Sequence, residues 1–286
     1  MMVHAHRAHA LPFFLTATVG ERFCLYHQPD PEVPERGAVL YVHPFAEELN
    51  KSRRMAALQA RAYARAGYGV LQLDLYGCGD SSGDFADARW PLWLDDLALG
   101  WQWLAQRSPS PRYLWGLRLG ALLALEFAAR AQPAPSGLVL WQPVISGRAH
   151  LSQFMRMQSA ARLFGATTAP VADGGDACAE VAGYRLAPEL IEAIKQADAP
   201  PAPPCPVQWL ELAAPSSPSP PRSTPQPALQ PASALLIERW SRAGAQVEAF
   251  PLDGEPFWAT PEITEVPGLL ATTLDAMPAP LLAERP

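Results

Sequence analysis

The sequence predicts an α/β fold with a mostly parallel central sheet flanked by helices. Strand-like and helix-like segments alternate over the first half of the chain, and this alternation implies right-handed crossovers between parallel strands. A stretch with helical spacing and no apolar β-run then follows at 148–204, and strand character returns at 207–212. We therefore expect a core formed by 1–147 and 205–286, with a helical cap insertion at 148–204.

The strands are predicted from short apolar runs bounded by turn residues. The run 38–42 is apolar throughout, which is typical of a strand buried on both faces of a sheet. Before it, the residues from 11 to 26 predict two short strands joined by a turn at Gly20. The remaining strands are expected at 69–73, 113–115, 137–141, 207–212 and 246–250.

The helices are predicted from the spacing of apolar residues. Over 50–66, Met55, Leu58 and Ala62 have helical spacing, and Gly67 is a stop signal. The stretch 213–231 is dominated by Pro, Ser and Ala and predicts a flexible, exposed loop within the core. The other helices are expected at 91–106, 119–131, 150–164, 188–196, 232–244 and 261–276.

Composition excludes several classes of protein. The 286 residues carry a net charge of -6 and no basic run, which argues against nucleic acid or an anionic membrane surface as a partner. No segment is long and apolar enough to span a bilayer. The cysteines form no C-x-x-C pair, so we expect reduced thiols in a cytoplasmic protein, with no metal or other cofactor. They are Cys24, Cys78, Cys178 and Cys205.

The most informative motif lies at 113–124, where a short strand runs through Gly116 and Gly120 into an apolar helix. In α/β-hydrolases a G-x-S-x-G turn of this kind is the nucleophile elbow, which lifts a serine above the sheet. Here Arg118 occupies the middle position. Chance glycine spacing is the alternative, but the loops described next favour the α/β-hydrolase fold. An arginine stays protonated and is no acyl nucleophile.

A loop after the strand 38–42 begins His43-Pro44-Phe45-Ala46. Hydrolases place there a loop whose backbone N–H groups form half of the oxyanion hole. Pro44 has no N–H group, so we expect Phe45 or Ala46 to donate, together with Leu119 after the elbow. The His43 side chain is interpreted as a structural brace.

A second loop, at 74–83, follows the pattern D-x-x-G-x-G-x-S-x-G that recurs in many α/β-hydrolases. Asp74 is expected to accept backbone N–H groups there, which is a structural role. Ser81 and Ser82 are not expected to act as nucleophiles, because the sequence indicates no base beside them.

The other two triad positions also lack their usual residues. Glu255 and Pro256 stand where the histidine belongs, and no Asp or Glu occurs between Glu211 and Glu238. After Arg148 the sole histidine is His150. Three losses together indicate that the serine-hydrolase mechanism is lost.

Arg118 is expected at the N-terminus of a helix, which favours anions. One hypothesis is that Glu255 forms a partly buried ion pair with Arg118 and closes the site; the other is that Arg118 binds a carboxylate or phosphate. A plain structural salt bridge remains an alternative. Gln142, at the end of a strand, is a further pocket candidate. The candidate cleft residues are His43, Glu47, Glu48, Arg118 and Glu255; the candidate anion-binding residues are Phe45, Ala46, Leu119 and Arg118. We expect the tryptophans of this half of the chain to pack in the core: Trp90, Trp93, Trp101, Trp103, Trp115 and Trp141.

With these motifs, at 43–55, 74–85, 116–125 and 254–260, the chain resembles the exosortase A system-associated hydrolase 2 family, a branch of the α/β-hydrolases. The resemblance implies a bacterial protein encoded near exopolysaccharide and PEP-CTERM protein-sorting genes, and a protein partner from that system. Two functions stay open. One is hydrolysis of acyl or ester groups through unconventional residues. The other is non-catalytic binding of a small anionic molecule or a partner protein in the former cleft.

Overall fold

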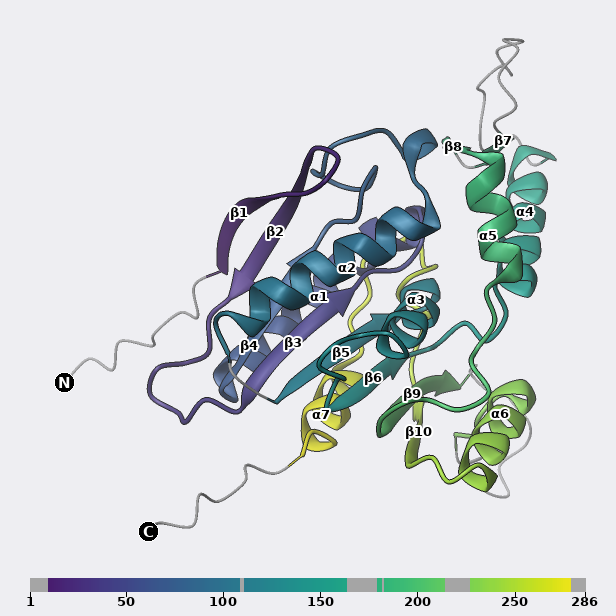
Figure 1. The fold of residues 1–286 in the computed structure, drawn as a ribbon. Coiled ribbons are helices and arrows are strands. Elements are labelled where there is room, and N and C mark those ends of the chain that lie inside the picture. The colour runs from purple at the N-terminus through teal and green to yellow at the C-terminus, as the bar shows by residue number, and fades with distance from the viewer. Residues whose placement is uncertain (1–9, 109–110, 164–178, 182, 214–226, 279–286) are drawn as a thin grey trace, which may run out of the picture.

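The structure is a computed structural model that describes residues 10–108, 111–163, 179–181, 183–213 and 227–278. Its secondary-structure elements are arranged as in Figure 1. In chain order they are β1 (Ala10–Thr16), β2 (Glu21–His27), β3 (Gly37–Val42), α1 (Glu47–Arg65), β4 (Tyr68–Leu73), η1 (Phe85–Asp87), α2 (Trp90–Ala105), β5 (Arg112–Leu117), α3 (Leu119–Ala128), β6 (Gly137–Trp141), α4 (Gly147–Leu163), β7 (Ala179–Val181), β8 (Tyr184–Leu186), α5 (Pro188–Gln196), β9 (Val207–Ala213), α6 (Pro231–Arg242), β10 (Val247–Asp253) and α7 (Pro267–Asp275).

The central sheet has eight strands within the described residues, in the order β1-β2-β4-β3-β5-β6-β9-β10. β1 and β2 pair antiparallel, as do β2 and β4. All later neighbours pair parallel. The prediction of a mostly parallel sheet is therefore confirmed, and each predicted strand is present.

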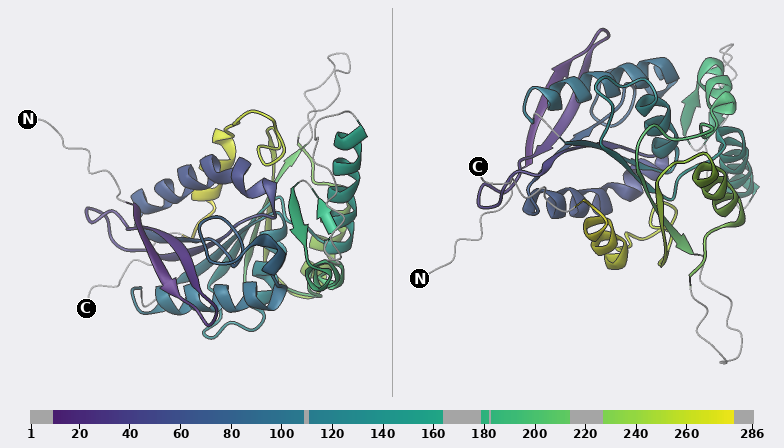
Figure 2. Two further views of the ribbon diagram at one scale, coloured as in Figure 1. Left: turned by 90° about the horizontal axis from the view of Figure 1, so that it is seen from above. Right: turned by 60° about the horizontal axis from the view of Figure 1, so that its bottom comes forward.

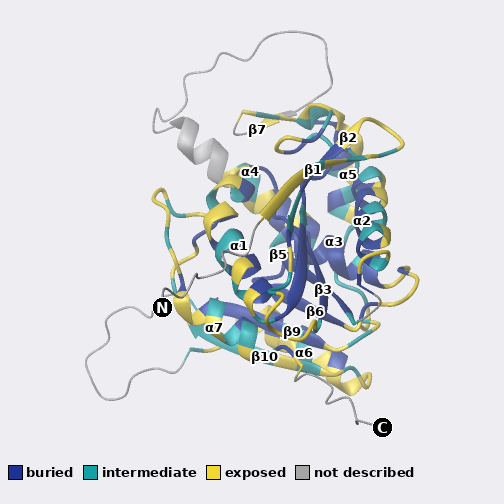
Figure 3. Cartoon of the chain, turned by 90° about the vertical axis from the view of Figure 1, so that its left-hand side faces the viewer, coloured by how far each residue is buried: buried dark blue, intermediate teal, exposed yellow. Residues whose placement is uncertain are grey.

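Helices cover both faces of this sheet (Figure 2). α1 and α7 pack on one face over an apolar cluster that contains Tyr63, Trp115 and Trp141. α2, α3 and α6 pack on the other face, where Trp101 and Trp240 belong to the larger cluster. The middle strands are buried along their whole length, as Figure 3 shows for β3 and β5. Of the six tryptophans expected in the core, five are buried, and Trp103 is half-buried against the ring of Phe13.

Two helices begin at other residues than predicted. α1 begins at Glu47 rather than at residue 50, directly after Ala46, whose φ is 50° and which makes no side-chain cap. The last helix begins at Pro267 rather than at 261. Proline is favoured in the first turn of a helix because its missing N–H would have had no helical partner there.

The segment between β6 and β9 contains α4, α5 and a two-stranded antiparallel sheet of β7 and β8. This hairpin was not predicted, because three-residue strands carry no recognisable apolar run. Leu151 of α4 and Leu190 and Ile194 of α5 join the same apolar cluster as α2 and α3. Most of the loop predicted at 213–231, and Cys178, lie outside the described residues.

Candidate functional site

The backbone at Arg118 makes a sharp turn between β5 and α3. Its φ of 56° and ψ of -121° define a conformation that side-chain-bearing residues rarely adopt. A Cβ atom on Gly116 would lie 2.5 Å from the Cα atom of Ala121, and one on Gly120 would lie 2.3 Å from the carbonyl oxygen of His43. Both positions therefore require glycine, which confirms the interpretation of this motif as an elbow rather than a chance spacing.

The Arg118 side chain forms an ion pair with Glu48 in the first turn of α1. Arg118 Nε donates to Glu48 Oε1 at 3.2 Å, and the two side chains are only 17% and 15% exposed. The guanidinium carbon also lies 5.3 Å from the centroid of the Trp258 ring, within the range of a cation–π contact.

The hypothesis that Glu255 is the partner of Arg118 is wrong. Glu255 is exposed, whereas the adjacent Phe257 and Trp258 are buried. The earlier start of α1 is the physical reason, because it places Glu48 in the first helical turn and against the elbow. In working hydrolases the corresponding loop carries the histidine. Here this loop packs the rings of Phe257 and Trp258 into the interior instead.

A cavity of about 370 Å³ lies beside the elbow. The candidates Glu47, Glu48, Arg118 and Gln142 line it, whereas the candidates His43 and Glu255 are not among its lining residues. Its walls also include Lys51, His150, Gln153, Phe154, Gln230, Pro256, Trp258 and Ala259. No serine, threonine or cysteine belongs to that lining in the described part of the chain.

His43 has both ring nitrogens engaged away from this cavity. Its Nδ1 lies 2.8 Å from the carbonyl oxygen of Pro44, which can only accept, and its Nε2 lies 3.2 Å from the backbone N of Leu75. The ring is therefore the neutral tautomer that donates through Nδ1 and accepts through Nε2. Burial lowers its pKa. The interpretation of His43 as a brace is confirmed.

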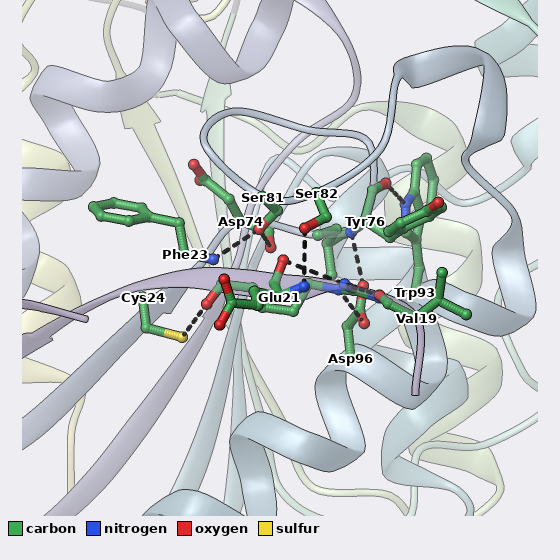
Figure 4. A network of polar contacts seen from close by, with 12 residues as sticks. Val19, Glu21, Phe23, Cys24, Asp74, Tyr76, Ser81, Ser82, Trp93 and Asp96 are labelled. Carbon is green, nitrogen blue, oxygen red and sulfur yellow. Dashed lines mark hydrogen bonds and ion pairs between the residues drawn. The ribbon is translucent and has the colours of Figure 1, made fainter. Parts of the chain in front are cut away.

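The loop at 74–83 is held by its own side chains and by β2 (Figure 4). Asp74 Oδ2 accepts the backbone N–H of Asp80 at 3.0 Å. Ser81 Oγ donates to the carbonyl oxygen of Asp74 at 2.5 Å and accepts the backbone N–H of Phe23 at 2.9 Å. These bonds confirm the structural role expected for Asp74 and show that Ser81 Oγ holds the loop as well.

A neighbouring network in Figure 4 joins β2, α2 and the same loop. Ser82 Oγ accepts the backbone N–H of Glu21 at 2.9 Å. Arg22 and Asp96 form a buried ion pair at 2.6 Å, and the second carboxylate oxygen of Asp96 accepts the backbone N–H of Tyr76. Burial raises the pKa of Asp96 to about 6 despite the adjacent arginine. Sequence reasoning missed this pair, which anchors the loop.

The cavity-wall residues that sequence reasoning missed include His150 and Trp258. His150 is 6% exposed, and its Nε2 is buried with no hydrogen-bond partner among the described residues. Burial and the charge of Arg118 lower its pKa to about 3. That it is the sole histidine after Arg148 was visible in the sequence, but its place beside the elbow depends on how α4 packs.

The acid of a triad is also absent from its usual place. Glu211, within β9, is buried and accepts from the indole N–H of Trp209 at 3.0 Å and from the backbone N–H of Gln230. It therefore secures the chain ahead of α6. Phe45, Ala46 and Leu119 line a separate small hollow together with His43 rather than the cavity beside Arg118, and their predicted role in anion binding stays a prediction.

The described residues meet neither the requirements of a metal site nor those of a membrane span. Across the described ranges, no three His, Cys, Asp or Glu side chains gather closely enough to bind a metal ion. Over the same ranges, none of the helices has both the length and the apolar character needed to cross a membrane. Cys24, Cys78 and Cys205 are free thiols.

The parallel sheet and the glycine-flanked elbow between β5 and α3 define an α/β-hydrolase fold. A model of the family described as serine aminopeptidase, S33 matches residues 33–177, just over half of the chain. The chain belongs to this family, although the matched region carries Arg118 at the nucleophile position. A search of curated proteins finds no match.

Solved structures show the same fold at low sequence identity. Est1E from Butyrivibrio proteoclasticus, with bound ferulic acid, is 14% identical over 92% of this chain and 96% of its own, with a TM-score of 0.62. A soluble variant of monoglyceride lipase from Saccharomyces cerevisiae is 13% identical over 93% of this chain and 94% of its own, with a TM-score of 0.61. An alpha-beta serine hydrolase homologue from Coxiella burnetii is 13% identical over 94% and 97%, with a TM-score of 0.56.

Proposed function

We propose that this protein is a non-catalytic α/β-hydrolase relative that binds a small anionic molecule in the cavity beside Arg118. The observation that carries the proposal is the guanidinium at the nucleophile position, held by Glu48 through Nε. An arginine cannot form an acyl intermediate, because it stays protonated and has no lone pair to attack with. Among the described residues, the lining of this cavity offers no hydroxyl or thiol in its place.

The electrostatics of the elbow support an anion as the ligand. Within the described residues, the Arg118 side chain makes its hydrogen bond through Nε, so the two Nη groups keep a free fork. Such a fork matches a carboxylate, which it binds through two parallel hydrogen bonds. Phe45, Ala46 and Leu119 do not line this cavity, so the proposal does not depend on their N–H groups.

The size and walls of the cavity fit a small molecule. Its volume of about 370 Å³ falls within the range of roughly 300–1,000 Å³ that ligand pockets have. Phe154 and Trp258 contribute apolar surface, and Gln142 and Gln153 contribute amides. His150 and Phe154 come from α4, so we also propose that the insertion at 148–204 acts as a cap over this cavity.

The motif resemblance supports a proposal about the cellular location and the partner of this protein. Because the stretches 43–55 and 254–260 resemble the exosortase A system-associated hydrolase 2 family, we propose a cytoplasmic role with a protein partner in exopolysaccharide and PEP-CTERM sorting systems. Hydrolysis of acyl or ester groups is the competing function. Its support is the family membership and the fold shared with esterases and lipases.

Calorimetric titration with acetate, butyrate and cyclohexanecarboxylate tests the proposed function. At least one of these carboxylates is expected to bind the wild type, and Arg118→Ala is expected to abolish that binding. Arg118→Lys is expected to weaken it about tenfold, since lysine keeps the charge but lacks the fork. Glu255→Ala is the matched control, because Glu255 is exposed and does not line the cavity. Binding that survives in Arg118→Ala would contradict the proposal.

A further inference from the structure

Two buried polar atoms in the wall of this cavity have no hydrogen-bond partner among the described residues. They are Glu48 Oε2 and His150 Nε2. A buried polar atom left unpaired destabilises the fold, and native structures contain few of them. Glu48 and His150 both line the cavity beside Arg118, so a ligand in that cavity lies against both side chains.

The charge state of each group limits what the ligand offers. Glu48 engages Arg118 through Oε1 alone, which leaves Oε2 to bind something else. Its pKa is raised by burial, and Arg118 acts in the opposite direction. His150 is neutral at ordinary pH, because its pKa is lowered to about 3. A neutral imidazole nitrogen either donates or accepts, depending on the tautomer.

A hydroxyl group suits both atoms. It donates its proton to Glu48 Oε2 and accepts from the N–H of His150 Nε2 with its lone pair. A second carboxylate or a phosphate dianion offers acceptors only and would be repelled by Glu48. The two Nη groups of Arg118 remain for a carboxylate at the other end of the ligand.

We infer that the ligand of this cavity is a hydroxylated carboxylate, whose carboxylate binds Arg118 and whose hydroxyl binds between Glu48 and His150. This inference rests on the proposed function, since it takes Arg118 as the anion-binding group. In this arrangement the elbow recognises the charge, and α4 recognises the hydroxyl through His150. The hydroxyl is thus recognised by one residue of the core, Glu48, and by one residue of the insertion, His150.

Matched pairs of carboxylates test the inference by calorimetric titration. The pairs are lactate and propionate, 3-hydroxybutyrate and butyrate, and D-glucuronate and cyclohexanecarboxylate; glucose serves as a hydroxylated probe without charge. In at least one pair, the wild type is expected to bind the hydroxylated member about tenfold more tightly, which is what one or two good hydrogen bonds supply. Glucose is expected not to bind.

The variants His150→Phe and Glu48→Gln are expected to abolish that preference, measured as the ratio of the two dissociation constants within a pair. Glu255→Gln is the matched control and is expected to keep the wild-type preference. Melting temperatures of all variants show whether each remains folded.

The outcomes separate this inference from the proposed function. If each pair binds equally well and Arg118→Ala abolishes binding, the proposed function stands and the hydroxyl inference is overturned. If the preference for the hydroxylated member persists in both His150→Phe and Glu48→Gln, the inference is likewise overturned. If no carboxylate binds the wild type, or glucose binds as well as D-glucuronate, both are overturned.

Discussion

Arg118 Nε lies 3.2 Å from Glu48 Oε1, and this contact joins the elbow ahead of α3 to the first turn of α1. In a working serine hydrolase the residue at the elbow must hold a hydroxyl toward the substrate. Here the same strained turn carries Arg118, whose guanidinium already binds the Glu48 carboxylate through Nε. The turn has the geometry of a nucleophile elbow, and an arginine occupies its tip.

The Glu48–Arg118 pair is expected to show coupling in a double-mutant cycle. Glu48→Ala leaves the cation of Arg118 mostly buried without its anion, and Arg118→Ala does the reverse. Because the side chains of Glu48 and Arg118 are still 15% and 17% exposed, we expect a coupling energy of about 1–2 kcal/mol, below that of a fully buried pair. Urea denaturation of the wild type, both single variants and the double variant measures it. Strict additivity of the two single variants would show that the pair contributes nothing.

The backbone conformation of Arg118 is expected to cost stability. Its φ of 56° favours glycine, because a Cβ atom is strained there. Arg118→Gly is therefore expected to be about 1 kcal/mol more stable than Arg118→Ala, although both lose the same guanidinium. Thermal unfolding of the two variants checks this. If the alanine variant is as stable as the glycine variant, the elbow is relaxed rather than strained.

The glycines of the elbow are expected to be intolerant of even one added methyl group. A Cβ atom at Gly120 would meet two backbone carbonyl oxygens at 2.3 and 2.4 Å, so Gly120→Ala is expected to destabilise the fold by about 3 kcal/mol or more. Gly268, in α7, has no atom within 4 Å of the corresponding position. Gly268→Ala is therefore the matched control, expected to stabilise by about 0.5–1 kcal/mol through helix propensity. Equal effects of the two changes on the melting temperature would refute the close approach.

His150 is expected to make the protein sensitive to acid. Its pKa is about 3 in the folded protein, against 6.5 for the ordinary side chain. Above pH 6.5 both states are neutral; as the pH falls from 6.5 toward 3, the unfolded chain takes up a proton that the folded protein does not. The free energy of unfolding then drops by about 1.4 kcal/mol per pH unit.

Between about pH 7.5 and about pH 5, the wild type is expected to lose about 2 kcal/mol more than His150→Gln. Urea denaturation of the two proteins at both pH values measures the difference. A wild type and a variant that lose the same free energy would show that His150 takes up its proton in the folded state as well.

The core of the fold was predictable from the sequence because its signals are local. The apolar run at 38–42 became β3, buried at every position, and the two glycines around Arg118 marked the elbow. These patterns need no knowledge of distant contacts. The same is true of Asp74, whose role followed from the glycine-rich loop in which it lies.

The partner of Arg118 was not predictable, because it depends on where α1 begins. Ala46 ends the preceding loop with a positive φ and makes no side-chain cap, so no start signal precedes Glu47. The resulting shift of three residues brings Glu48 to the elbow, while Glu255 faces solvent. The place of His150 likewise follows from the packing of α4 against the core, which no local pattern encodes.

The central claim is that the elbow no longer supports catalysis. Hydrolysis of short-chain and long-chain p-nitrophenyl esters by the purified wild type, with Arg118→Ala and Glu255→Ala alongside, tests it most directly. We predict rates no higher than those in buffer for all three proteins. Turnover by the wild type that falls in Arg118→Ala would contradict the claim and establish an enzyme that works without a triad.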